Sequence, residues 1–164
     1  MRLLTLLVLA LGCSKAAPPP GKAVSVSALC NEPDKSHVRL DGYVRYRRGL
    51  MSFCSNHGGH KTCDLELYER AERPPAFDII KPSTGPAPLT AKLSVPVGGD
   101  PGEMDDLPGK FEDSDIKLHL PQGAVALEGA RVLIDGTVTV IPNDPKTPNA
   151  AKTCFAAVKW AAGA

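Results

Sequence analysis

The stretch that decides the fold is His37–Tyr46, HVRLDGYVRY, together with its counterpart Arg131–Ile141, RVLIDGTVTVI. Both contain the pattern V-x-[LI]-D-G-x-V, in which apolar and polar residues alternate. Alternation with a period of two predicts a β-strand with one face against a core. A glycine, Gly42 or Gly136, interrupts the apolar face of each strand, where glycine is typical of a bend or a bulge. We therefore predict two long, bent strands at the centre of one all-β domain.

Shorter segments between and after these strands also alternate. We predict strands at CDLELYE, FDII, IKLHL and AKTCFAAVKW, which are residues 63–69, 77–80, 116–120 and 151–160. The 16 prolines and 15 glycines are spread through the chain, and no long apolar pattern with a 3.6-residue period lies between them. Irregular loops should therefore join the strands. The segment Val24–Cys30 fits either a short strand or one helical turn.

The two long strands and the terminal strand resemble the oligonucleotide/oligosaccharide-binding (OB) fold over roughly residues 36–160. This resemblance implies a small five-stranded Greek-key barrel in which the first and fourth strands are the long ones. Corner glycines let one strand serve both halves of such a barrel. A two-sheet β-sandwich is the alternative architecture for the same strands.

The first thirteen residues, MRLLTLLVLALGC, have the features of a short secretory signal, which we predict here. Arg2 precedes an apolar run, Leu3–Leu11, that is shorter than the about 20 residues a membrane-spanning helix needs. The ending Ala10-Leu11-Gly12-Cys13 resembles the lipobox of bacterial lipoproteins, with Ala10 where that family most often has Leu. The resemblance implies cleavage before Cys13 and acylation of Cys13 with chains such as palmitate. An ordinary signal peptide cut elsewhere is the alternative.

These features divide the chain into three parts. Residues 1–12 are expected to be a signal peptide, residues 13–23 the lipidated cysteine with a Pro-rich tether, and residues 24–164 a single β domain. In the lipoprotein family a serine after the cysteine, here Ser14, is compatible with the outer membrane. Loss of Arg2 leaves 18 Lys and Arg against 18 Asp and Glu, so the mature formal charge is zero. No global field then points to nucleic acid or anionic lipid as a partner.

Four cysteines remain for the domain: Cys30, Cys54, Cys63 and Cys154. An even number in an exported domain favours disulfides, because compartments outside the cytosol are oxidising. Three pairings are possible. Sequence proximity selects Cys54–Cys63, which leaves Cys30–Cys154 to join the two ends of the domain.

The stretch CSNHGGHKTC also permits a metal site made of Cys54, His57, His60 and Cys63. Thiolates and neutral imidazoles suit zinc, and copper is also compatible with this set. The spacing favours the disulfide instead, because structural zinc sites usually take their ligands from two separated segments. A disulfide would leave His57 and His60 as a weak metal contact at most.

A basic and aromatic cluster offers a ligand face: Tyr43, Arg45, Tyr46, Arg47 and Arg48. OB barrels hold single strands through such aromatic and basic residues, but nucleic acid is scarce outside the cytoplasm. A surface glycan or an envelope protein is an alternative partner for this face. The alternative without a ligand is that these residues form the charged end of a strand beside a turn.

The sequence contains no G-x-S-x-G, H-E-x-x-H or P-loop motif. We therefore expect a non-catalytic binding or scaffolding module, without a cofactor, that is lipid-anchored in the bacterial cell envelope. The outer membrane, facing the periplasm or the cell surface, is the expected location. A periplasmic zinc- or copper-binding protein is the alternative function.

Overall fold

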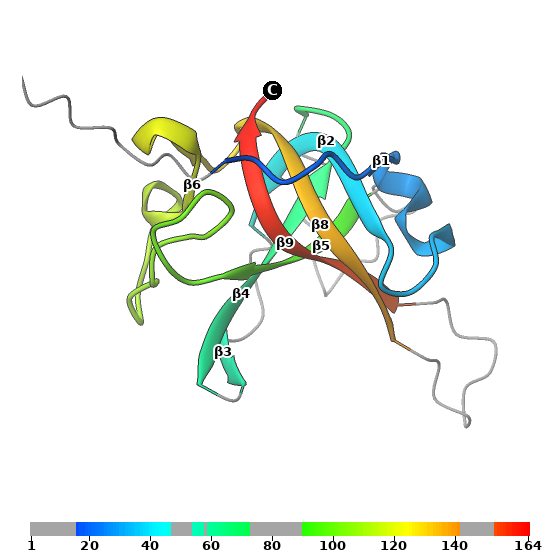
Figure 1. Ribbon diagram of the computed structural model, residues 1–164. Helices are drawn as coiled ribbons and strands as arrows, with labels where there is room; N and C mark the ends of the chain where they lie inside the picture. Colours follow the sequence, from blue (N-terminus) through cyan, green and yellow to red (C-terminus); the bar gives the residue numbers. More distant parts are fainter. Residues whose placement is uncertain (1–15, 47–53, 58, 73–89, 142–152) are drawn as a thin grey trace, which may run out of the picture.

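The structure, a computed structural model, describes residues 16–46, 54–57, 59–72, 90–141 and 153–164 (Figure 1). Strands dominate these residues, so the predicted all-β class is confirmed. The elements are, in chain order, β1 (Lys22–Ala23), η1 (Val26–Asn31), β2 (His37–Arg45), β3 (Cys54–His57), β4 (His60–Tyr68), β5 (Thr90–Pro96), η2 (Asp113–Asp115), β6 (Lys117–His119), η3 (Pro121–Gly123), β7 (Val125–Leu127), β8 (Arg131–Ile141) and β9 (Thr153–Gly163), where η denotes a 3-10 helix.

The two copies of the repeated pattern pair with each other. β2 and β8 are antiparallel, and Leu40 lies opposite Ile134 at the centre of their register. On either side, the glycine of each copy lies opposite a valine of the other, as Gly42 does with Val132. The valines and the central Leu–Ile pair are fully buried. The two copies of the pattern therefore lie side by side in the sheet and are related by a local two-fold axis near Leu40 and Ile134.

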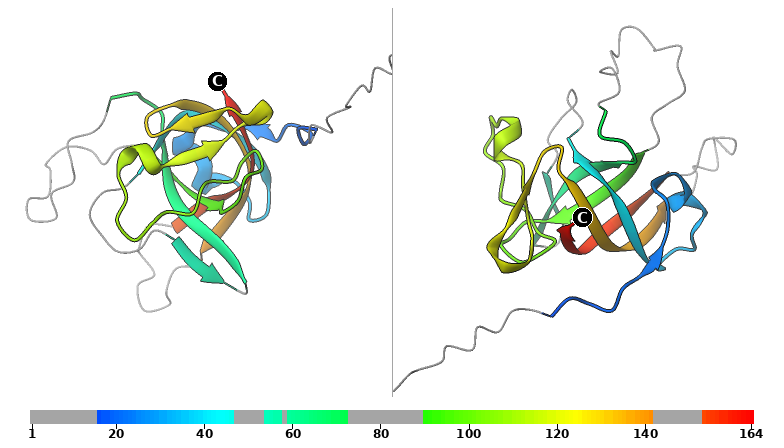
Figure 2. Two further views of the ribbon diagram at one scale, coloured as in Figure 1. Left: turned by 90° about the vertical axis from the view of Figure 1, so that its left-hand side faces the viewer. Right: turned by 90° about the horizontal axis from the view of Figure 1, so that it is seen from above.

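The main sheet has seven strands in the order β1-β2-β8-β9-β5-β4-β3, and β2 also pairs with β4 through Tyr43–Arg45 (Figure 2). β5 and β9 are parallel, as are β1 and β2, whereas the other pairs are antiparallel. The prediction of five strands is not confirmed, because β1 and β3 add to the sheet. A second sheet contains only β6 and β7, so the described residues do not form two sheets of similar size.

Both mid-strand glycines stand where another backbone comes close. A Cβ atom on Gly42 would lie 2.6 Å from the carbonyl oxygen of Tyr68, and one on Gly136 would lie 2.8 Å from that of Ala157. β8 also changes register against β9 between Asp135 and Gly136. The expected irregularity at the second glycine is therefore present, and at both glycines a side chain would collide with the neighbouring strand.

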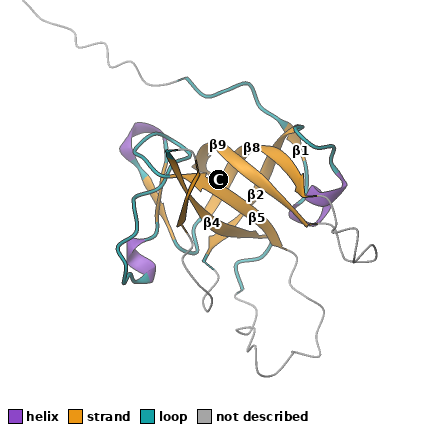
Figure 3. Cartoon of the chain, turned by 90° about the horizontal axis from the view of Figure 1, so that it is seen from below, coloured by secondary structure: helices purple, strands orange, loops and turns teal. Residues whose placement is uncertain are grey.

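The interior is apolar, and a disulfide joins η1 to the sheet. Cys30 of η1 is bonded to Cys154 of β9, with Cα atoms 5.5 Å apart, and Val26 and Leu29 of η1 are buried beneath it. The ambiguous segment Val24–Cys30 thus contains a 3-10 helix. Figure 3 shows η1 at one side of the strands, with η2 and η3 at the opposite side.

Four strands were not expected from the sequence: β1, β3, β5 and β7. β3 is the four-residue partner of β4 in the hairpin that contains Cys54 and Cys63. β1 lies at the end of the predicted tether and pairs with β2. β5 alternates as a strand should, with Ala91, Leu93 and Val95 buried, but its seven residues follow a proline-rich stretch. β7 has only three residues, too few for a period to be recognised. The strand expected at Phe77–Ile80 lies outside the described residues.

Candidate ligand-binding site

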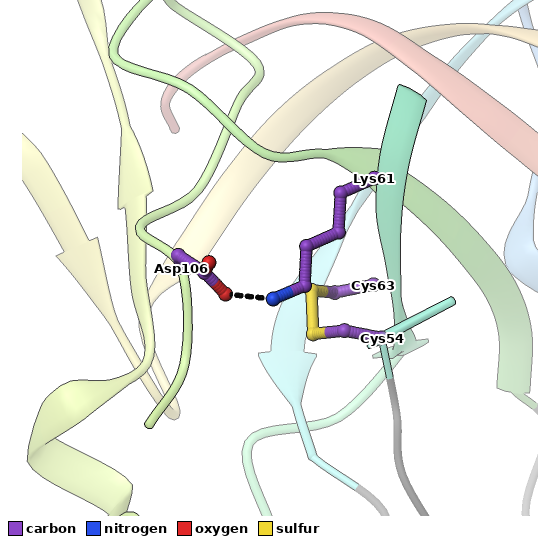
Figure 4. The surroundings of a disulfide bond; sticks show 4 residues. All are labelled: Cys54, Lys61, Cys63 and Asp106. Carbon is purple, nitrogen blue, oxygen red and sulfur yellow. Dashed lines mark hydrogen bonds and ion pairs between the residues drawn. A yellow bond between two sulfur atoms is a disulfide. The ribbon is translucent and has the colours of Figure 1, made fainter. Parts of the chain in front are cut away.

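The cysteine and histidine stretch folds as a β-hairpin. Cys54 of β3 lies opposite Cys63 of β4, and a disulfide joins them with their Cα atoms 4.0 Å apart (Figure 4). Beside the disulfide, Lys61 forms an ion pair with Asp106 from the loop after β5. Both predicted disulfides are therefore present, and this one fixes the base of the hairpin to the sheet.

The alternative metal site is not formed. It requires Cys54 and Cys63 as thiolates, but their sulfur atoms are bonded to each other and cannot bind zinc or copper in that form. His60 is exposed at the end of the hairpin, and Cys63 is fully buried. Within the described ranges, no three His, Cys, Asp or Glu side chains are grouped so that they could hold a metal. The structure thus has a disulfide in place of the two thiolates that the metal site requires.

The described residues of the predicted basic and aromatic face, Tyr43, Arg45 and Tyr46, do not line one groove. Arg45 turns back onto the protein, where its Nη1 donates to Glu128 Oε2 at 3.3 Å and its Nη2 donates to the carbonyl oxygen of Ala71. Its side chain is 16% exposed, so most of the guanidinium is unavailable to a ligand. Tyr43 and Tyr46 line two different grooves. Arg47 and Arg48 lie outside the described residues.

The larger groove contains Tyr46 and has a volume of about 800 Å³. Tyr46 follows β2 and meets Phe111 with the ring centroids 5.1 Å apart and the planes at 75°, an edge-to-face pair. Both rings are half-buried. We call this the aromatic groove; its lining residues are Tyr46, Gly109, Lys110, Phe111, Glu112, Asp113 and Ser114.

One side of the aromatic groove is a short turn that is held by its own hydrogen bonds. Glu112 caps η2, because its backbone N–H donates to Asp115 Oδ2 at 2.8 Å while its own carboxylate accepts from the Asp115 N–H. This capping box fixes the turn that follows Phe111. The groove thus presents an aromatic pair beside carboxylate, hydroxyl and ammonium groups on a defined backbone.

The smaller groove contains Tyr43 and has a volume of about 430 Å³. Its polar groups are already engaged with one another. Arg131 donates to both carboxylate oxygens of Asp41, at 3.0 and 2.8 Å, and this hydrogen bonding raises the pKa of Arg131. Glu69 accepts from the N–H and the hydroxyl of Ser27.

One sequence motif near the aromatic groove has the S-x-x-K spacing of a serine nucleophile and its lysine, namely Ser114 to Lys117. That spacing places two side chains on one face only in a helix. Here η2 ends at Asp115, and Lys117 begins β6. The local backbone therefore lacks the geometry that the motif needs.

Phe111 and the turn after it were missed by the sequence analysis, which assigned them no role. Phe111 has no apolar neighbours in sequence, and the contact with Tyr46 joins segments 65 residues apart. An isolated aromatic residue in a polar loop was the available signal.

No helix among the described residues is long and apolar enough to cross a membrane. A comparison of the chain with protein-family profiles and with curated proteins finds no match.

Proposed function

We propose that the protein is a lipid-anchored binding module of the bacterial cell envelope and that its ligand, a glycan, occupies the aromatic groove. The observation that carries the proposal is the Tyr46–Phe111 pair, because an aromatic ring beside carboxylate and hydroxyl groups is suited to a polyhydroxylated ring with an apolar face. Glu112 and Asp113 oppose the single Lys110 in this groove, which disfavours a phosphate backbone. A non-catalytic role is part of the proposal.

The fold is proposed to be of the OB type. Pairing runs from β2 to β4, β5, β9, β8 and back to β2, and the β5–β9 pair is the parallel one. Under this proposal β1, β3 and the β6–β7 hairpin are additions to a five-stranded barrel. OB barrels use surface strands and loops to bind oligonucleotides and oligosaccharides. This arrangement supports a binding role without identifying the ligand.

The envelope location rests on two independent features. Two disulfides are typical of proteins that mature in an oxidising compartment. The lipobox-like ending at Cys13, which lies outside the described residues, supplies the proposed anchor. Diacyl and N-acyl chains on one cysteine satisfy the requirement for two membrane signals, since each buried methylene contributes about 0.8 kcal/mol.

The ligand is tested with immobilised glycans prepared from the cell envelope. We expect the mature protein to bind, and Tyr46→Ala and Phe111→Ala each to weaken binding by roughly tenfold or more, because truncation of an aromatic anchor typically costs over 1 kcal/mol. Tyr43→Ala is the matched control, since it removes the same type of side chain from the other groove, three residues before Tyr46. It should bind as the wild type does.

Two results would contradict the glycan assignment. One is the absence of glycan binding by a protein whose disulfides are intact. The other is equal loss of binding in the Tyr43, Tyr46 and Phe111 variants. Recovery of an envelope protein whose retention depends on Phe111, with no glycan bound, would replace the glycan with a protein ligand at the same groove.

The anchor is tested with Cys13→Ser. This substitution removes the acylated sulfur, so we expect unprocessed precursor and no acylated product. Acylation that persists in the variant, or a wild-type protein cleaved beyond residue 13, would exclude the proposed anchor.

A further inference from the structure

The segment Gly21–Ser25 connects the proposed tether to the domain and is held against β2. β1 pairs in parallel with β2, placing Lys22 opposite Val38 and Ala23 opposite Arg39. The Val24 N–H then donates to the carbonyl oxygen of Arg39 at 3.0 Å. We call Gly21–Ser25 the strap. Figure 1 shows it beside β2, on the edge that β4 leaves uncovered in this part of the strand.

A fully buried carboxylate holds the start of the strap. Asp135 neighbours the buried Ile134 and therefore faces the outer side of the sheet, yet none of its side chain is exposed. Its Oδ1 accepts the N–H of Gly21 at 2.9 Å. Its Oδ2 accepts from Arg39 at 2.7 Å, and the His37 ring nitrogen lies 3.6 Å from Oδ1. The strap is thus part of what removes this charge from water.

The strap is bound by few other interactions. Lys22 and Ala23 are exposed, and Val24 is the strap residue that packs against the core. Lys22 pairs with Glu32 at 2.8 Å, but the Lys22 side chain is 68% exposed, so the pair adds little. A segment with exposed side chains and few apolar contacts opens at a lower free energy than the core does.

The strap can detach from β2 only as far as the start of η1. Val26 and Leu29 are buried, and Cys30 is disulfide-bonded to β9, so the chain from Val26 onward is fixed to the domain. On the outer side of the sheet, Asp135 would gain water as the strap leaves. The released state therefore does not leave an isolated charge in an apolar interior.

We propose that the strap is a releasable part of the tether that sets how far the anchored domain stands from the membrane, with Asp135 as the positioning residue. This rests on the proposed anchor at Cys13. With the strap bound, the chain from Cys13 to Gly21 reaches at most about 27 Å, whereas release to Val26 extends the reach to about 44 Å. Release also uncovers the edge of β2 at Val38 and Arg39.

Hydrogen exchange of the full mature chain tests the strap independently of the anchor. In Asp135→Ala we expect the Gly21 and Val24 amides to exchange at least about tenfold faster than in the wild type. The variant loses the acceptor of the Gly21 amide, and the strap that carries Val24 should then open more often. The amides of β8 and β9 should remain much slower than those of the strap. Asp41→Ala is the matched control. Asp41 is the equivalent residue of the other copy and lines a groove with Val24 and Ser25, but its carboxylate pairs with Arg131, while the Gly21 and Val24 amides donate to Asp135 and to the Arg39 carbonyl oxygen.

A second pair of variants guards against failure of Asp135→Ala to fold. Gly21→Ala places a Cβ 2.6 Å from the carbonyl carbon of Val38 and should displace the strap. Gly99→Ala, where nothing lies within 4 Å, is its control. Strap amides that stay as protected as in the wild type in both test variants, or that open only together with β8 and β9, would overturn the proposal.

The effect on reach is measured with the acylated protein on lipid vesicles, using a fluorophore at exposed Asn56 and an acceptor in the bilayer. Asp135→Ala should transfer less energy than the wild type and Asp41→Ala. Failure of the wild type to bind vesicles refutes the anchor alone. Binding with equal transfer in all three proteins refutes the strap's control of reach.

Discussion

The two copies of V-x-[LI]-D-G-x-V share a sequence and a strand geometry, but their aspartates have different surroundings. Asp41 of β2 is 44% exposed at its side chain and pairs with Arg131 across the strands. Asp135 of β8 is fully buried, and the position equivalent to Arg131 is held by His37. Asp135 has Arg39 and the Gly21 N–H as further partners. The repeated pattern thus predicts a strand in both places. The exposure and the partners of the aspartate depend instead on which residues pack against the outer face of that strand.

The largest expected effect should be common to both copies. Gly42→Val and Gly136→Val should each destabilise the protein by about 3 kcal/mol, because the added Cβ would meet a carbonyl oxygen of the adjacent strand at 2.6 or 2.8 Å. Chemical denaturation measured with the disulfides intact gives the free energy of unfolding.

The control for these variants is Gly99→Val, which has open space around its Cβ position and should change stability little. If both strand variants unfold within about 0.5 kcal/mol of the wild type, the close approach of the strands at the glycines is wrong.

The next largest effect on stability should differ between the two copies of the pattern. Asp135→Ala should cost about 2 kcal/mol of unfolding free energy, since it removes the acceptor for Arg39 and for the Gly21 N–H in a buried site. Asp41→Ala removes an exposed pair and should cost much less. Equal losses in the two variants would show that burial does not distinguish the aspartates.

The smallest effect concerns Asp64, which faces the outer side of β4, lies opposite Ser94 of β5 and has Lys92 as its neighbouring cation. Burial raises the pKa of Asp64 above its ordinary value of 3.8, and the charge of Lys92 only partly opposes this. The folded state therefore holds this proton more tightly than the unfolded chain. Its contribution to stability is present below pH 3.8 and is lost as pH rises through the raised pKa of the folded state.

Asp64→Asn should remove this dependence and slightly stabilise the protein at neutral pH relative to the wild type. Unfolding free energies measured for both proteins between acidic and neutral pH test it. A variant whose pH profile parallels that of the wild type would show that Asp64 does not titrate differently in the folded state.

The strands and the disulfides were predictable because their signals are local or countable. Val38, Leu40, Val132 and Ile134 alternate with polar residues, and four cysteines in a chain predicted to be exported favour two disulfides. The aromatic groove was not predictable, since Tyr46 and Phe111 meet only after the sheet has formed. The same holds for Asp135, whose sequence context matches that of the exposed Asp41. Periodicity shows which face a residue takes, but not what will cover that face.

We propose that the disulfide-bonded β domain is attached to the envelope through Cys13. Intact-mass analysis of protein extracted from the envelope under non-reducing conditions tests it most directly. We predict the mass of residues 13–164 plus the acyl groups, less two hydrogens for each of the two disulfides. An unmodified Cys13, a chain that retains residues 1–12, or four free thiols would contradict the account.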